Sequence, residues 1–176
     1  PDGTDYQNLI VFAEIVKPER IVYDHVSTPK FRNTVTFVEE GGKTRVTMRA
    51  VLEDKAAYEM AVKTFKAVEG GRQTLGRLAN FVEGPDGERA KTLDLGPLSE
   101  ASLREKEGLC EVTLVRDLPH PRATVWEVLT NPLHLQEWAP FLADRNLGAE
   151  GKATLTMIDG GAMNVIGTRV TRAEPP

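Results

Sequence analysis

The sequence contains one cysteine, Cys110, and no apolar run long enough to cross a bilayer. A disulfide within the chain needs two cysteines, so nothing requires an oxidising compartment and the cytoplasm is the expected location. The apolar runs are only a few residues long, as at 9–13, whereas a membrane helix needs roughly 20 residues. We therefore expect no membrane segment.

Clusters of lysine and arginine are also missing. The chain carries 22 of these basic residues against 26 acidic ones, and its formal net charge is −4. Nucleic-acid binders gather basic side chains on one face, because phosphate contacts supply much of their affinity. The composition therefore argues against nucleic acid as a partner.

The common motifs of catalysis and cofactor binding are absent as well. Gly-Gly-Lys-Thr at 41–44 ends like a phosphate-binding loop, but Phe37 stands where that loop needs its first glycine. No Gly-x-Ser-x-Gly nucleophile motif occurs. The histidines fall in separate predicted elements, without the short spacings of zinc ligands, at His25, His120 and His134. We expect no catalytic residues, no metal and no cofactor.

Residues 7–52 have the composition and period of β-strands. Valine, isoleucine, phenylalanine and threonine are frequent, and Val46, Met48 and Ala50 alternate with polar residues. This period of two is typical of a sheet with one buried and one solvated face. Glycines at 41–42 allow the positive φ angles of a tight hairpin. The pattern predicts antiparallel strands at 7–16, 20–26, 34–39 and 43–52.

A helical period replaces this alternation after Asp54, the expected N-cap. Apolar residues recur three or four positions apart from Tyr58 to Val82, on one helical face. Glycine inside a helix costs about 1 kcal/mol relative to alanine. We therefore expect the glycines at 70–71 to divide the helix into pieces at 55–67 and 71–83, packed on the sheet.

Residues 84–109 have the composition of a linker, rich in charge, glycine and proline, with a short helix expected at 98–107. Residues 110–176 then form a second segment. Its expected elements are a strand at 111–118, helices at 122–129 and 133–138, and strands at 153–158 and 163–173 with a hinge at 159–161. The chain is thus predicted to be an α+β protein of two segments, 1–83 and 110–176.

A short repeat relates the two segments. Asp2-Gly3 precedes a strand and then Pro18, and Asp159-Gly160 precedes a strand and then Pro175. In both cases the proline stands sixteen positions after the aspartate. The repeat predicts that the same structural step occurs twice.

The first segment contains PERIVY at 18–23, VTFVEEGGKTRVTM at 35–48 and EGGRQTLGRLANFVE at 69–83. These stretches resemble the C-terminal half of the family of activator-of-heat-shock-protein-ATPase homologues, within the START-like, birch-pollen-allergen-like superfamily. The second segment contains VTLVRDLPHPRATVWEVLTNPLHLQEWAP at 112–140 and resembles the family's N-terminal half. It departs from the family at two places. Trp138 is a single tryptophan where the family usually has a pair, and Ala139-Pro140 follows it where the family has Gly-Pro.

The two halves therefore stand in inverted order. They can form one circularly permuted domain, the inner halves of a tandem pair cut from a longer protein, or a homodimer that exchanges halves. In each arrangement we expect the halves to pair, because an isolated half would expose apolar area worth about 25 cal/mol per Å². The resemblance implies a helix-grip fold, in which a curved antiparallel sheet wraps around the long helix.

The resemblance also implies a cavity between the sheet and the long helix, with its mouth at the two short helices. The leading hypothesis is a non-enzymatic domain that binds a small apolar molecule, such as a lipid or an aromatic compound, in this cavity. The candidate lining residues are Phe12, Tyr23, Val35, Phe37, Met48, Phe65, Leu75, Trp126, Trp138 and Phe141. One alternative is a co-chaperone-like module that stimulates a chaperone ATPase. Another is an enzyme of the cyclase or hydrolase kind, which would need ionisable groups inside the cavity.

Overall fold

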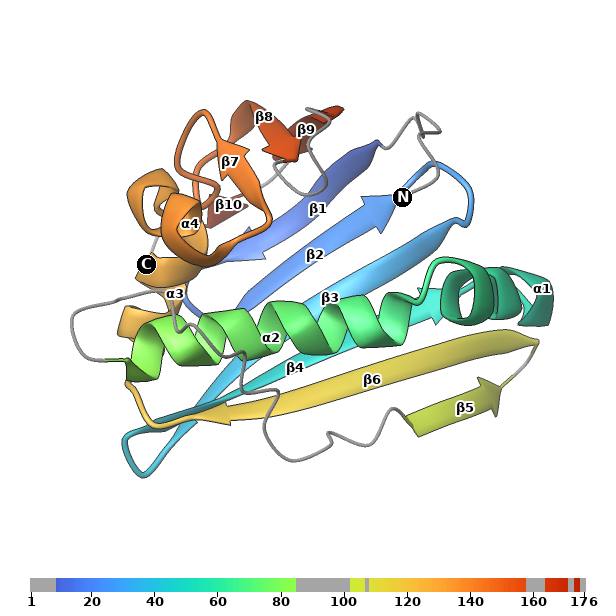
Figure 1. Cartoon of the computed structure of the whole chain (residues 1–176), viewed down its shortest axis with the longest axis horizontal. Helices are drawn as coiled ribbons and strands as arrows, with labels where there is room; N and C mark the ends of the chain where they lie inside the picture. The colour runs from blue at the N-terminus through green and yellow to red at the C-terminus, as the bar shows by residue number, and fades with distance from the viewer. Residues whose placement is uncertain (1–8, 85–101, 107, 158–163, 171–172, 175–176) are drawn as a thin grey trace.

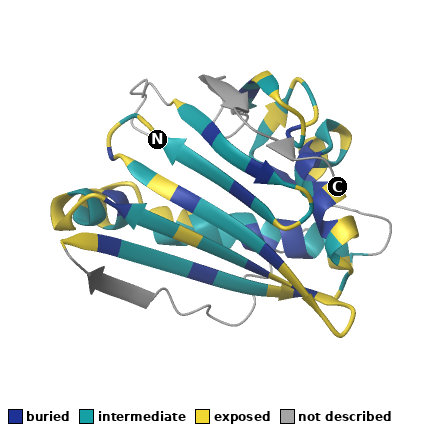
Figure 2. Ribbon diagram, turned by 180° about the vertical axis from the view of Figure 1, so that it is seen from behind, coloured by how far each residue is buried: buried dark blue, intermediate teal, exposed yellow. Residues whose placement is uncertain are grey.

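The computed structural model describes residues 9–84, 102–106, 108–157, 164–170 and 173–174. The described strands join in one sheet, in the order β5-β6-β4-β3-β2-β1-β9-β8-β7, with β10 beside β1. Helix α2 lies across one face of this sheet, and α3 and α4 lie near one end of α2 (Figure 1). Seen from behind, the opposite face carries no helix among the residues described (Figure 2). The fold is α+β, as the sequence predicts, with a curved sheet that grips one long helix.

The first four strands form an antiparallel meander. They are β1 (Ile10–Val16), β2 (Arg20–His25), β3 (Phe31–Glu40) and β4 (Lys43–Leu52). The predicted β4 is confirmed end to end, whereas β3 begins three residues earlier than Thr34, the first position of the predicted strand. Gly41 and Gly42 close the β3–β4 hairpin with φ angles of 59° and 75°, the left-handed region that favours glycine.

The helix is interrupted, but the predicted position of the interruption is wrong. The helical region consists of α1 (Lys55–Glu59), a π-helical turn η1 (Met60–Thr64) and α2 (Ala67–Glu83), which runs through both glycines without interruption. The predicted N-cap is confirmed, because the Asp54 carboxylate accepts a hydrogen bond from the Ala57 amide at 2.7 Å. The chain instead bends at Lys66, whose φ is 53°.

Close packing explains why α2 contains Gly71. A Cβ atom built at this position would lie 2.5 Å from Leu114 Cδ1 on β6. The glycine therefore lets α2 approach the sheet closely, and this contact outweighs the intrinsic cost of a glycine within the helix.

The second segment follows the predicted order of elements. Its strands and helices are β6 (Leu109–Leu118), α3 (Arg122–Thr130), α4 (Pro132–Trp138), β7 (Phe141–Ala143), β8 (Gly151–Met157), β9 (Asn164–Val170) and β10 (Ala173–Glu174). Asn131 caps α4 by accepting a hydrogen bond from the Leu133 amide at 3.0 Å, and Pro132 starts the helix. The short β7 is an addition to the predicted elements, and the hinge expected at 159–161 lies outside the described residues.

The prediction of a short helix at 98–107 is wrong for residues 102–106, the part of this range that the structure describes. Ser102–Lys106 form the edge strand β5, which pairs antiparallel with β6. The open edge of β6 supplies backbone partners for an extended segment, and this tertiary pairing overrides the local preference of the sequence.

The two segments share one sheet and one core. Strand β4 pairs antiparallel with β6 from Thr44 opposite Leu118 to Leu52 opposite Cys110. The Thr44 hydroxyl donates to the His120 carbonyl oxygen at 2.6 Å. The core draws its large buried side chains from both segments: Phe12, Ile15, Phe37, Val46, Leu75, Leu78, Leu114, Leu118, Val125, Trp126, Leu135 and Trp138. Pairing of the two segments is therefore observed within a single chain.

The strands that follow the two copies of the predicted repeat lie side by side in the sheet. Strand β1 pairs in parallel with β9, with Ile10 opposite Thr168, and with β10, with Ile15 opposite Ala173. The sheet is thus antiparallel except at this junction, which differs from the fully antiparallel sheet that the resemblance implies. The assignment of the segments to inverted family halves stays a prediction.

Candidate functional site

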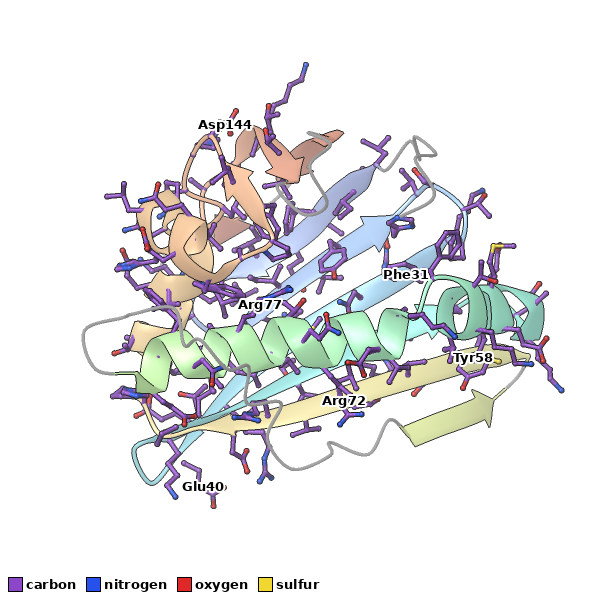
Figure 3. The ribbon with its side chains drawn as sticks, in the orientation of Figure 1. Phe31, Glu40, Tyr58, Arg72, Arg77 and Asp144 are labelled. Atoms are coloured by element: carbon purple, nitrogen blue, oxygen red, sulfur yellow. The ribbon has the colours of Figure 1, made fainter. Side chains whose placement is uncertain are left out.

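A cavity of about 220 Å³ lies between the sheet and the first turns of α2. Its walls come from both segments and are mostly apolar: Tyr23, Phe31, Asn33, Met48, Ala50, Leu52, Ala61, Val62, Ala67, Val68, Gly71, Val112 and Leu114. Figure 3 shows Phe31 at the beginning of β3, close to the bend between α1 and α2. The cavity lies beside this bend, because its helical walls come from η1 before Lys66 and from α2 after it.

Two polar side chains interrupt the apolar lining. Tyr23 on β2 and Asn33 on β3 stand opposite each other in the strand register. The Asn33 side-chain amide Nδ2 donates a hydrogen bond to the Tyr23 hydroxyl oxygen at 2.6 Å. The Tyr23 ring also meets Phe12 edge to face, with ring centroids 5.8 Å apart. The strands and the core thus fix the position of this pair.

Burial sets the protonation state of Tyr23. Loss of hydration raises the pKa of its phenol above the usual value of 10.0, and the hydrogen bond with Asn33 opposes this rise only in part. At neutral pH the Tyr23 hydroxyl therefore keeps its proton and can donate a hydrogen bond.

The raised pKa makes the protein less stable in strong alkali. An unfolded chain releases the Tyr23 proton near pH 10.0, whereas the folded chain retains it to higher pH. The contribution of Tyr23 to the free energy of unfolding is therefore complete below that pH and is lost as the pH rises toward the folded-state pKa. Urea denaturation at increasing alkaline pH measures this loss, and the decline should be shallower in Tyr23→Phe. An equally steep decline in that variant would contradict the assignment.

The structure brings only part of the predicted set to this cavity. Tyr23 and Met48 line it, and Phe65 is 44% exposed at the end of η1. The other predicted residues lie elsewhere in the core or packed against it: Phe12, Val35, Phe37, Leu75, Trp126, Trp138 and Phe141. Phe37 and Trp126, for example, fill their surroundings by meeting edge to face at a centroid distance of 5.6 Å.

The cavity lies at the other end of α2 from the expected mouth. Helices α3 and α4 pack near the C-terminal end of α2, where Phe81 and His134 have ring centroids 6.0 Å apart. The lining residues of α2 are instead at its beginning, from Ala67 to Gly71. The adjoining helical wall is η1, through Ala61 and Val62.

Sequence reasoning missed Asn33 as a site residue, although a signal for it was present. Along β3, the side chains on the inner face are Phe31, Asn33, Val35 and Phe37, because alternate residues of a strand face the same way. Asn33 is the polar member of this apolar series and is only 4% exposed. A polar residue at a core-facing position is the informative exception in such a pattern.

A second hollow of about 320 Å³ adjoins Phe31 at the surface, beside Asp24, His25 and Lys30. Its histidine is already engaged, because His25 Nδ1 lies 2.8 Å from the Pro29 carbonyl oxygen and the ring stacks on Phe31 at 4.7 Å. Asp24 pairs with Arg32, which lowers the pKa of its carboxyl group through a side-chain hydrogen bond. These contacts account for His25 and Asp24 at this hollow.

Two other classes of site find no support in the part of the chain that the structure describes. No group of three or more histidine, cysteine, aspartate or glutamate side chains is placed to hold a metal ion there. None of the described helices is long and apolar enough to cross a membrane.

The comparison with family models bears directly on the walls of the cavity. Residues 1–83 match the model described as Activator of Hsp90 ATPase homolog 1-like protein. These residues are therefore similar to that family, and the match does not reach the second segment. The matched segment supplies every lining residue except Val112 and Leu114 of β6. The Hsp90-activator-like segment thus holds the polar pair and most of the cavity, and the second segment closes one side. No curated protein and no solved structure matches the chain.

Proposed function

We propose that this protein binds a small apolar molecule in the cavity between the sheet and α2, without catalysing a reaction on it. The observation that carries the proposal is a cavity of about 220 Å³ with mostly apolar walls. A dry protein cavity of about 150 Å³ lined by apolar side chains binds benzene. The larger volume here suits an aromatic compound of two fused rings or a short lipid chain.

The chemistry of the lining favours binding over catalysis. Tyr23 is the one ionisable side chain among the described residues that line the cavity. General acid–base catalysis works best when a group has a pKa close to the working pH, and burial moves the Tyr23 pKa in the opposite direction, above 10.0. A role in positioning a ligand fits this side chain better than a role in proton transfer.

A chaperone is the second class of partner, because the matched family is described as activator-like toward the Hsp90 ATPase. Such a partner would contact the outer surface rather than the cavity. Its binding should therefore be insensitive to a substitution that only fills the cavity.

Filling the cavity should abolish ligand binding. Ala50 lies on the inner face of β4 and lines the cavity, so Ala50→Phe places a ring in the space that the ligand needs. With naphthalene as the probe, we expect affinity to fall at least about tenfold, corresponding to 1.4 kcal/mol. Isothermal titration calorimetry measures this change.

The matched control is Val51→Phe, on the same strand but on the opposite face of the sheet. This variant adds the same ring outside the cavity and should bind naphthalene like the parent protein. Equal affinities in all three proteins would contradict binding in this cavity. Native mass spectrometry of the protein from its host should in addition show a co-purifying neutral apolar compound that Ala50→Phe lacks.

A further inference from the structure

The Tyr23–Asn33 pair has hydrogen-bonding capacity that the protein leaves unused. Asn33 is only 4% exposed, and its Oδ1 atom is buried without a hydrogen-bond partner. A buried acceptor without a donor is costly, so native interiors rarely contain one. Because Asn33 lines the cavity, a bound molecule can supply the missing donor.

The tyrosine side of the pair is also incomplete. Its oxygen accepts the hydrogen bond from Asn33 Nδ2 at 2.6 Å, so its own O–H proton needs a different acceptor. A hydroxyl group offers one donor and two acceptor lone pairs. The pair thus leaves one acceptor, Asn33 Oδ1, and one donor, the Tyr23 hydroxyl, without a partner, on two residues that both line the cavity.

Rotation of the carboxamide does not remove this need. If the amide turned over, Tyr23 would donate to Asn33 Oδ1, and the N–H donors of Asn33 would be left without an acceptor. A hydroxyl group can complete the pair in either orientation, because its proton can go to Asn33 Oδ1 and its oxygen can accept from the N–H donors.

We propose that the ligand of this cavity carries a neutral hydroxyl group on an apolar frame, seated between Tyr23 and Asn33, as in a phenol or a simple alcohol. This inference rests on the proposed function and specifies its ligand class. A hydroxyl group matches the pair in both directions, because its oxygen accepts from Tyr23 while its proton goes to Asn33 Oδ1.

Other ligand classes fit the lining less well. A carboxylate or an ammonium group would enter a cavity whose described walls contain no charged side chain, and an unpaired charge in such a place is strongly disfavoured. A pure hydrocarbon would leave both polar groups unsatisfied and would also keep water from them. The raised pKa of Tyr23 supports its role as a donor at neutral pH.

A thermodynamic cycle with matched ligands tests the proposal. The probes are 2-naphthol and 2-methylnaphthalene, which have nearly the same shape and differ in a hydroxyl and a methyl group. Calorimetry gives the Kd of each for the parent protein, for Asn33→Leu and for Tyr23→Phe. The measured quantity is the ratio of the methyl compound's Kd to the hydroxyl compound's Kd, compared between parent and variant, because the different hydration of the two probes cancels in that comparison.

We expect this ratio to fall at least about tenfold in Asn33→Leu, since an unpaired buried polar group typically costs enough for that change. Tyr23→Phe should lower the ratio in the same direction, and it serves alone if Asn33→Leu does not fold. The control Thr34→Val changes the next residue of β3, on the opposite face of the sheet, and should leave the ratio unchanged.

The outcomes separate this inference from the proposed function. If both probes bind and neither variant changes the ratio, the hydroxyl inference is wrong while binding in the cavity stands. A bound water molecule could instead complete the polar pair. Both probes would then bind, and the Kd ratio would be the same in the parent protein and in Tyr23→Phe, which also overturns the inference. If neither probe binds the parent protein, both the inference and the proposed function fail.

Discussion

A fragment that ends at Gly84 is expected to lack a stable fold, although it contains every residue of the family match. Strand β4 would lose its whole pairing with β6, from Thr44 to Leu52. The apolar face of α2, with Leu75 and Leu78, would lose the core partners that the second segment supplies. Exposed apolar area costs about 25 cal/mol per Å², and the net stability of a domain is only about 5–15 kcal/mol. The fragment therefore cannot retain the native sheet.

Circular dichroism and urea denaturation provide the measurement. We expect no cooperative transition from fragment 1–84 alone, and recovery of one when fragment 102–176 is added in equal amount. A full-length chain cleaved by protease within 85–101 is the control, because both segments remain present. A cooperative transition of full size from 1–84 alone would show that the two segments are independent units.

Trp126→Ala should destabilise the full chain more than other single truncations on α3. The Trp126 side chain is 1% exposed and packs edge to face on Phe37 of β3, at a centroid distance of 5.6 Å. Truncating a buried tryptophan to alanine typically costs about 3–5 kcal/mol, because the apolar contacts are lost and a cavity remains. The residue joins α3 of the second segment to the sheet of the first, so this cost falls on the interface between them.

Urea denaturation gives the free energy of unfolding for this variant. Leu133→Ala, in the adjacent α4, is a suitable control because Leu133 is 67% exposed, and a surface substitution of this kind usually changes stability by about 0.5 kcal/mol or less. Similar values for the two variants would mean that Trp126 does not connect the segments.

The strands of the first segment were predictable because their signal is local. The alternation of Val46, Met48 and Ala50 with polar neighbours is a direct consequence of strand geometry, and β4 appears where this pattern begins and ends. The N-cap at Asp54 was predictable for the same reason, since its carboxylate and the amide it binds lie three residues apart.

The course of the helix was not predictable, because distant contacts decide it. Gly71 is tolerated in α2 owing to Leu114 on β6, which is far away in the sequence. Phe65 has the spacing of an inward-facing residue, but the π-helical turn before it and the bend at Lys66 shift the helical phase and leave it 44% exposed. The same bend lies beside the cavity, so its helical lining residues could not be placed correctly from a regular helical period.

The parallel alignment of β1 with β9 and β10 determines which end of the molecule is suited to chemical attachment. Ile10 pairs with His25, next to the turn that leads to Phe31 at the cavity, whereas Val16 pairs with Glu174 at the opposite end of β1. A fluorophore or a surface linker attached at Glu174 therefore starts about one strand length, or roughly 20 Å for six or seven residues, from the end of β1 where Ile10 pairs with His25. Attachment at Glu174 should thus leave the end of the sheet near the cavity free, which suits binding assays on immobilised protein.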